Sequence, residues 1–395
     1  MKKSLIAVAV ASAFVAPAAI AEVTISGAIN VGITAIKSGT DTAGNNSITR
    51  TSLANNYSHI DVESADDIGG GNKVVMHYQM QTNPGGLGDT PTNRNSFLGV
   101  IGTWGAFKMG TNENVYERWM YESDPLDGAV GLGGSIQMLG HSGRSGSAWF
   151  ITDNVKGDQF WRRTSNTVSY ESPNMGGFTF EIDHTLSAFK TNGGGTTFAV
   201  DPQTGLVKSV TTTASDPTIT SIGGQFKPDA APFFVNVGYE KHKDVTNSLG
   251  GANDKATALQ VGGGYTIADL TLLARYERIS YKAIGGTLYG APTDKLDVKH
   301  YWVAAKYNLP SGYLGAEIGL APNLKVAGGD VSQTKARMYS LGYFHNLSKQ
   351  SQLQLIATRI SNDAKINYGI GAGTGSVNGD GADYSGFTVG LKHTF

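Results

Sequence analysis

Patterns that could support catalysis or cofactor binding are scarce in this sequence. Residues 140–143 (Gly-His-Ser-Gly) place a serine beside a histidine, but they lack the Gly-x-Ser-x-Gly spacing and the strand-to-helix turn of a nucleophile elbow. Residues 69–71 are three glycines that no predicted helix follows, so they suit a turn better than a phosphate site. Asp380 and Asp383 lack a metal-ligand spacing, and the chain contains no cysteine. We therefore expect no enzymatic activity, no cofactor and no bound metal.

Charged side chains remain, and many of them fall in one long polar stretch, residues 113–161. Its acids are Glu113, Glu117, Glu122, Asp124 and Asp127, followed by Asp153 and Asp158. Most loop acids are solvated or hydrogen-bonded within their own loop. In a narrow, low-dielectric passage, however, such charges would shape the potential that a passing ion experiences. Whether these acids are solvated or face a passage depends on the elements that position residues 113–161.

The first 21 residues are predicted to be a secretory signal peptide and not part of the fold. Lys2 and Lys3 precede an apolar, alanine-rich run, and residues 19–21 (Ala-Ile-Ala) supply the cleavage pattern. The run is too short and too rich in alanine to be preferred as a membrane-spanning helix. The mature chain is therefore expected to begin at Glu22, to be exported, and to form one domain over residues 22–395.

Composition narrows the class of the mature chain. It has no apolar run long enough for a spanning helix and no disulfides, so its stability must come from a large core, from oligomerisation or from lipid. Without the two lysines of the signal peptide, 29 basic residues face 32 acidic ones, a balance near −3 that argues against nucleic acid as a partner. The 53 glycines, with only 12 prolines, fit a β-protein with many turns, either soluble or in a membrane.

Alternation along several segments predicts strands with one apolar and one polar face. In residues 23–34 the odd positions are apolar or glycine, and the even positions are small or polar. Residues 300–309 and 387–395 repeat the pattern, although His393 interrupts the apolar series of the last segment. Tyr301 and Tyr307 fall in the apolar series, which suits the aromatic girdle of a membrane interface.

The connections between these segments are sorted by length. Seven short ones carry turn residues, at 66–70, 102–105, 172–177, 227–232, 266–269, 308–312 and 346–351. Eight long polar ones separate them, at 37–50, 82–93, 113–161, 190–217, 243–254, 282–297, 323–335 and 364–383. Because the two kinds alternate, they join 16 strands with both chain ends on the short-turn side. The sequence therefore predicts an all-β fold, a 16-stranded antiparallel transmembrane β-barrel.

Several segments resemble, in order and spacing, the general porins of β-proteobacteria. Residues 58–71 resemble the family's S-R-x-G-x-x-G-x-E-D-L-G-G-G stretch, and residues 94–110 resemble its paired strands ending in L-G-R-Q. Residues 163–178 are similar to its R-x-N-N-S-V-x-Y-x-S-P-x-x-G-G-F segment, and Phe395 matches its terminal aromatic residue. The resemblance implies a homotrimer among outer-membrane lipid and lipopolysaccharide. It also implies that the third external loop, here residues 113–161, folds into the lumen.

The family's constriction sets arginines of the barrel wall opposite carboxylates of the third loop. Arg94 and Arg163 fall on two of those wall positions, whereas two other family arginines are replaced, by His59 and Thr111. The wall is therefore expected to be less positive than the family pattern. Because histidine titrates near neutral pH, no permanent charge is assigned to His59. The constriction acids chosen from the loop, which lie near Pro125, are Glu122, Asp124 and Asp127.

The function that the resemblance implies is passive diffusion of ions and small hydrophilic solutes through a water-filled channel. Two retained arginines facing several loop acids predict weak ion selectivity. A substrate-specific channel of the same fold, for a sugar or an aromatic or organic acid, is the alternative. It is suggested by Trp119, Trp149 and Trp161, which are expected instead to pack the long loop against the barrel. An outer-membrane barrel enzyme would need a serine–histidine pair on its lipid-facing surface, and these strands supply none. A soluble secreted β-protein would be recovered without detergent.

Overall fold

The computed structural model describes most of the chain beyond the predicted signal peptide. The described residues are 22–55, 57–84, 92–126, 132–143, 160–186, 196–200, 207–211, 216–244, 255–282, 287–289, 291–292, 295–370 and 378–395. The signal peptide predicted at residues 1–21 lies outside them, as do Asp127 and Trp149. Within the described ranges, no helix is long and apolar enough to cross a membrane.

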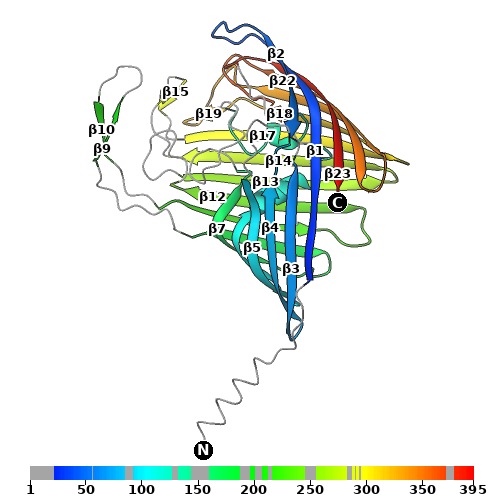
Figure 1. Cartoon of the computed structure of the whole chain (residues 1–395). Helices are drawn as coiled ribbons and strands as arrows, with labels where there is room; N and C mark the ends of the chain where they lie inside the picture. The colour runs from blue at the N-terminus through cyan, green and yellow to red at the C-terminus, as the bar shows by residue number, and fades with distance from the viewer. Residues whose placement is uncertain are drawn as a thin grey trace, which may run out of the picture.

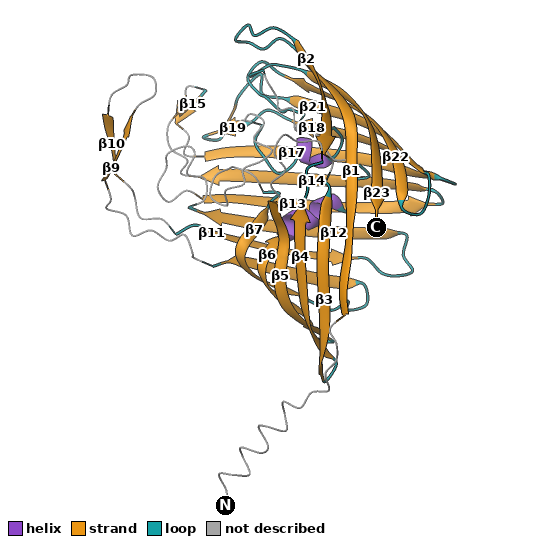
Figure 2. Ribbon diagram, viewed as in Figure 1, coloured by secondary structure: helices purple, strands orange, loops and turns teal. Residues whose placement is uncertain are grey.

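Sixteen antiparallel strands of the described residues close into a barrel (Figures 1 and 2). They are β1 (Glu22–Ser38), β3 (His59–Gly69), β4 (Asn72–Gln81), β5 (Thr92–Gly102), β6 (Gly105–Glu113), β7 (Arg163–Glu171), β8 (Phe178–Thr185), β11 (Thr218–Phe226), β12 (Phe233–Lys243), β13 (Lys255–Ile267), β14 (Leu270–Lys282), β17 (Lys295–Leu309), β18 (Gly312–Ala321), β21 (Ala336–Asn346), β22 (Ser351–Asn362) and β23 (Tyr384–Thr394). Each of these sixteen strands pairs with its neighbours along the chain, and β1 pairs with β23, so they form a closed ring. Closure gives the backbone groups of the membrane-spanning strands partners within the sheet. The predicted 16-stranded barrel is confirmed.

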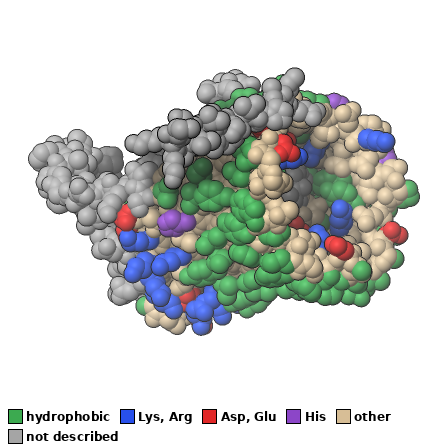
Figure 3. Space-filling model, turned by 90° about the horizontal axis from the view of Figure 1, so that it is seen from below, with side chains coloured by type: hydrophobic (Ala, Val, Ile, Leu, Met, Phe, Trp, Pro, Cys, Tyr) green, Lys and Arg blue, Asp and Glu red, His purple; other side chains and the backbone are tan. Residues whose placement is uncertain are grey.

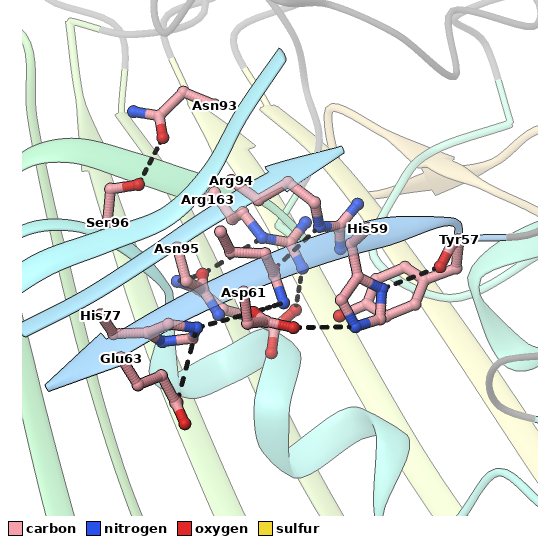
Figure 4. A network of polar contacts seen from close by, with 12 residues as sticks. Tyr57, His59, Asp61, Glu63, His77, Asn93, Arg94, Asn95, Ser96 and Arg163 are labelled. Atoms are coloured by element: carbon pink, nitrogen blue, oxygen red, sulfur yellow. Dashed lines mark hydrogen bonds and ion pairs between the residues drawn. The ribbon is translucent and has the colours of Figure 1, made fainter. Parts of the chain in front are cut away.

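The second strand of the barrel is broken near its middle. β2 (Ile48–Asn55) pairs with residues 31–38 of β1, and β3 pairs with residues 22–28 of the same strand. Tyr57, between β2 and β3, has a φ of 69°, in the left-handed region that an extended strand excludes. The break places Tyr57 and His59 beside the arginines of the inner wall (Figure 4).

The shorter elements lie in the long connections. The third connection contains α2 (Val115–Tyr121) and the 3₁₀ turn η1 (Ser135–Gln137). Short strand pairs occupy three other long connections: β9 (Thr196–Val200) with β10 (Val207–Thr211), β15 (Thr287–Leu288) with β16 (Ala291–Pro292), and β19 (Lys325–Val326) with β20 (Gly329–Asp330). The seven predicted short turns and eight predicted long connections all fall between the strands where the sequence places them.

Side chains alternate between a lipid-like outer surface and a polar interior. On β17, Tyr301, Val303 and Tyr307 are 46%, 51% and 47% exposed on the outside, whereas His300 and Trp302 are buried inside. Figure 3 shows hydrophobic side chains spread over the outer wall. Water would penalise so large an apolar surface, since contiguous exposed patches on soluble proteins rarely exceed a few hundred Å². The outer surface is therefore suited to lipid.

Part of the interior is filled with apolar side chains from the third connection. Tyr116, Met120, Leu126 and Met138 are completely or almost completely buried there. They belong to one hydrophobic cluster with inward-facing wall residues such as Trp302, Met338, Ile356 and Ile360. The barrel therefore has a packed core on one side of its lumen, built from a loop and the wall behind it.

Replacing Val303 with lysine tests the orientation of the strands. Val303→Lys places a charge in the outward apolar band, so it should lower the free energy of unfolding by about 2–4 kcal/mol. Urea titration of the barrel refolded into lipid vesicles, followed by tryptophan fluorescence, measures this change. Val75→Lys is the matched control because Val75 lies on the inward face of β4, two residues from His77, and should cost less than about 1 kcal/mol. An equal loss in both variants would contradict the assignment of the outer face.

Candidate pore constriction

The third connection begins with a short helix that docks on the inner wall. The backbone N–H of Val115 donates to Asp183 Oδ2 on β8 at 2.8 Å. The backbone N–H of Tyr116 donates to Ser221 Oγ on β11 at 2.9 Å. The first N–H groups of a helix have no partner within the helix. The wall therefore supplies the acceptors that α2 lacks.

Two buried glutamates of the wall hold the rest of the loop. Glu277 on β14 accepts hydrogen bonds from the backbone N–H of Gly140, at 2.9 Å and 3.1 Å to its two oxygens. Glu317 on β18 accepts from the backbone N–H groups of Gly134 at 3.2 Å and Leu126 at 3.3 Å. Both glutamates are almost completely buried. Buried carboxylates are costly unless they are hydrogen-bonded, so loop and wall stabilise one another.

Glu277 also links the third connection to the last one. Its Oε1 accepts the hydroxyl hydrogen of Tyr116 at 2.6 Å, and its Oε2 lies 2.6 Å from Nδ1 of His300. His300 Nε2 lies 2.8 Å from the hydroxyl of Tyr368, a residue of the last long connection. The carboxylate of Glu277 therefore contacts the third connection directly and the last long connection through His300.

An arginine and glycines complete the docking surface. Arg275 is buried and donates to Gln260, to Ser123 and to the backbone carbonyl of Trp119. A Cβ at Gly223 would lie 2.5 Å from Nε1 of Trp119, so only glycine lets the indole approach the wall. The predicted packing role of Trp119 agrees with this burial.

The two predicted wall arginines lie side by side on the inner surface, near the start of α2 (Figure 4). Arg163 donates from Nη2 to Glu113 Oε1 at 2.6 Å and from Nε to Asn95 Oδ1 at 3.2 Å. The guanidinium of Arg94 stacks 4.0 Å from the ring centroid of Tyr57. Its nitrogens also donate to the side chains of Gln79 at 3.1 Å and Gln81 at 2.8 Å. Both cations are therefore held in fixed positions.

An aspartate that the sequence analysis did not single out lies next to these arginines. Asp61 Oδ1 accepts from Gln79 Nε2 at 2.8 Å and lies 2.8 Å from His77 Nε2. Its Oδ2 lies 3.2 Å from His59 Nε2. His59 Nδ1 faces the Tyr57 carbonyl at 2.9 Å, which can only accept, so Nδ1 carries a hydrogen. When His59 is also protonated at Nε2, its contact with Asp61 becomes an ion pair.

The loop acids fall into three different environments. Glu113 is paired with Arg163, and Glu117 is buried close to it, with Oε1 accepting from the Tyr121 hydroxyl at 2.8 Å. Burial first, and then the charge of Glu113, raise the pKa of Glu117 to about 7. These two acids, at the start of the loop, are the ones that lie near the wall arginines.

The acids predicted for the constriction lie elsewhere. Asp124 is buried, and its Oδ1 accepts from the Leu126 backbone N–H at 2.9 Å, so it shapes the loop itself. Glu122 is partly exposed, with its carboxylate 3.7 Å from Nζ of Lys227, next to the short turn between β11 and β12. Asp127 is outside the described residues. Thr111 is half-buried on β6 and provides no charge.

The sequence contained a usable signal for two of the residues that were missed. Asp61 and His77 occupy inward positions of β3 and β4, which follow from their spacing to His59 along alternating strands. Glu277 and Glu317 also sit on inward positions in the middle of predicted strands. Their contacts with the loop could not be foreseen, because alternation gives the face of a residue but not its partner.

Comparison with known proteins agrees with this geometry. A family model described as Gram-negative porin matches residues 7–365. Outer membrane porin protein 32 of Delftia acidovorans is 24% identical over 401 residues, which cover 100% of both chains. The structure of an anion-selective porin from Comamonas acidovorans is similar with a TM-score of 0.72 at 20% identity, over 95% of this chain and 100% of that chain. The trimer form of OmpT from Vibrio cholerae gives a TM-score of 0.60 at 14% identity, over 95% and 99% of the two chains.

The family model covers most of the chain, and the barrel has the strand number, loop sorting and outward apolar surface of an outer-membrane channel. The chain therefore belongs to the Gram-negative porin family, the outer-membrane proteins through which ions and small hydrophilic solutes diffuse passively.

Proposed function

We propose that this porin is a general diffusion channel with weak ion selectivity, narrowed by the loop of residues 113–161. The narrowest passage would lie between the wall arginines and the start of that loop. The observation that supports it most directly is the fixed pair Arg94 and Arg163, with Glu113 and Glu117 of the loop beside them. The loop docks on β8 and on the wall from β11 to β23, so the part of the lumen beside the arginines is the part left for solutes.

Weak selectivity follows from charges that largely compensate each other. Arg94 and Arg163 lie beside Glu113 and Glu117, whereas Asp61 and Glu63 lie beside the imidazoles of His59 and His77. Opposite charges a few ångströms apart produce a field that decays rapidly with distance, especially in salt. A permeating ion would therefore experience a local transverse field and little net attraction or repulsion.

The similar porin from Comamonas acidovorans is described as anion-selective. Relative to the arginine-rich pattern expected from the family, this chain has His59 and Thr111 in the wall and Asp61 within 3.2 Å of His59. Each of these features reduces the permanent positive charge beside the passage. We expect the anion preference of this porin to be weaker for that reason.

The assembled protein would be a homotrimer embedded in outer-membrane lipid and lipopolysaccharide, after removal of residues 1–21 on export. The trimer form of the similar Vibrio cholerae structure supports this oligomeric state. No nucleic acid, metal or cofactor takes part in the proposed function. Size-exclusion chromatography with light scattering in detergent would measure the number of chains.

A substrate-specific channel is the second candidate. The aromatic ring of Tyr57 lies under Arg94 and 4.8 Å from the ring of His59, an arrangement that could hold an aromatic carboxylate. Single-channel recordings with sugars and aromatic acids decide between the candidates. Saturable block by one such solute at low millimolar concentration would favour the specific channel.

Removing the negative charge of Asp61 should increase anion preference. One charge about 8 Å from an ion contributes about 0.5 kcal/mol in water, with opposite sign for anions and cations, and salt reduces this. Asp61→Asn should therefore raise the anion-to-cation permeability ratio by roughly two- to fivefold, and Arg163→Gln should lower it by a similar factor. The reversal potential across a potassium chloride gradient measures both. If the permeability ratio were unchanged in both variants, the narrowest passage would have to lie elsewhere.

Acidification should shift the selectivity towards anions. Because the pKa of Glu117 is raised to about 7, this group is mainly ionised at pH 8 and mainly neutral at pH 6. The anion-to-cation permeability ratio should therefore increase as the pH falls through 7. Glu117→Gln should therefore reduce the change of this ratio between pH 8 and pH 6. An unaltered pH profile in Glu117→Gln would show that Glu117 does not act on the passage.

Removing the carboxylate of Glu277 should release the third loop from the wall. Glu277→Ala leaves the Gly140 N–H and the Tyr116 hydroxyl without their acceptor, at a cost of about 1–3 kcal/mol for each buried donor. We expect faster amide exchange in residues 132–143 and a noisier, larger single-channel conductance, with the barrel still folded. Glu171→Ala is the control because Glu171 also faces inward but pairs with Lys108 and not with the loop. Equal effects of both variants would contradict the anchoring role.

A further inference from the structure

We propose that a row of lysines on the outer wall binds the phosphate groups of lipopolysaccharide. The row consists of Lys243, Lys255, Lys282 and Lys295, at the ends of β12, β13, β14 and β17 next to long connections. This inference rests on the proposed function, because the long connections must face the cell exterior for the row to meet the outer leaflet.

The strand register places the four lysines directly opposite one another. Lys243 pairs with Lys255, Lys255 pairs with Lys282, and Lys282 pairs with Lys295. Directly paired residues point to the same face of a sheet. Their face is the outer one, because Leu259, four residues after Lys255, is 40% exposed on the outside. Neighbouring strands are about 4.8 Å apart, so the row extends over roughly 14 Å.

Three further cations lie on the same face between the row and the apolar band. Lys241 is two residues from Lys243, and Arg278 and Lys299 are paired with each other across β14 and β17. Two residues further along, Tyr276 and Tyr301 form the next outward pair, with ring centroids 5.4 Å apart. The basic residues therefore lie at the border of the apolar surface, where lipid headgroups meet hydrocarbon. Figure 3 shows Lys and Arg side chains gathered at one end of the outer wall, beside its hydrophobic surface.

The local carboxylates do not balance this charge. Asp297 lies 2.9 Å from Lys295 and 3.5 Å from Arg278, and Lys243 lies 3.5 Å from Asp216 and 3.9 Å from Asp244. In the described part of the chain, these three acids face seven cations, and no ion pair joins a carboxylate to Lys241, Lys255, Lys282 or Lys299.

Like charges directly opposite each other destabilise a sheet. Four lysines in one row therefore carry a cost that an anionic partner would remove. The partner must be anionic at the headgroup level and apolar below it, since the tyrosine pair and the apolar band follow immediately. A phosphorylated lipid has this distribution, and ammonium groups bind phosphate as point charges. In the outer leaflet of the outer membrane, the lipid with these properties is lipopolysaccharide.

The wall formed by β1, β21, β22 and β23 offers a natural control. Its outward cations near the long connections are single residues such as Lys37, Arg337 and Arg359. Arg359 is already paired with Asp383 at 3.3 Å, and the register places serines opposite Lys37 and Arg337. These cations do not form a continuous row.

Titration of the full-length protein in detergent with lipid A tests the proposal. The variant of the row combines Lys243→Gln, Lys255→Gln, Lys282→Gln and Lys295→Gln. The control removes the same charge elsewhere with Lys37→Gln, Lys335→Gln, Arg337→Gln and Arg359→Gln. We expect the wild type and the control to bind bisphosphorylated lipid A roughly tenfold more tightly than dephosphorylated lipid A, in a salt-sensitive manner, and the row variant to lose this difference.

Two outcomes would overturn the proposal: wild-type binding that does not depend on the phosphates, or an equal loss in the control. Single-channel conductance in neutral phosphatidylcholine bilayers separates this proposal from the proposed function. The row variant should conduct like the wild type while failing to distinguish the two forms of lipid A. A wild-type protein that forms no channel would contradict the proposed function and leave the lipid A measurement valid.

Discussion

The structure depends on one constraint, which is that a long loop inside a barrel must find partners for its backbone N–H groups. Here the partners are carboxylates of the wall: Asp183 at the start of α2, Glu277 at Gly140, and Glu317 at Gly134 and Leu126. Each of these acids is buried, and a buried acid needs donors as much as the loop needs acceptors. The arrangement is stable because both requirements are met at once, and removing either partner would leave the other one desolvated.

This docking divides the lumen into two unlike parts. On one side the loop and the wall from β8 to β23 form a packed core around residues such as Tyr116 and Trp302. On the other side, the charged side chains of β3 to β7 include Asp61, Arg94 and Arg163. The position of the loop thus separates the wall acids that anchor it, such as Glu277 and Glu317, from the wall charges of the proposed passage. Glutamate occurs in both parts: Glu277 and Glu317 anchor the loop, whereas Glu113 pairs with Arg163.

The barrel could be predicted from the sequence because its signals are local. Alternation gives the face of each residue, and turn residues mark the short connections, so 16 strands follow without any knowledge of contacts. The wall arginines were found through family resemblance, and Figure 4 places them together. The directions of Glu122 and Asp124 could not be predicted, because their loop has no periodicity that fixes them. Asp124 is turned into its own loop, and Glu113, one of the candidate acids but not among the three chosen, lies at the end of β6 beside Arg163.

The inner and outer surfaces of this barrel differ in how their charges are paired. Inside, Arg163 lies beside Glu113, and Asp61 lies beside His59 and His77, as the proposed weak selectivity requires. Outside, four lysines lie in one row at one end of the wall, and in the described part of the chain Lys255 and Lys282 have no ion pair with a carboxylate. Water and mobile ions can screen a charge inside the passage. An outward charge at the lipid border faces lipid headgroups instead. Paired charges within the chain therefore suit a pore, and an excess of cations suits an outer surface that contacts lipid headgroups.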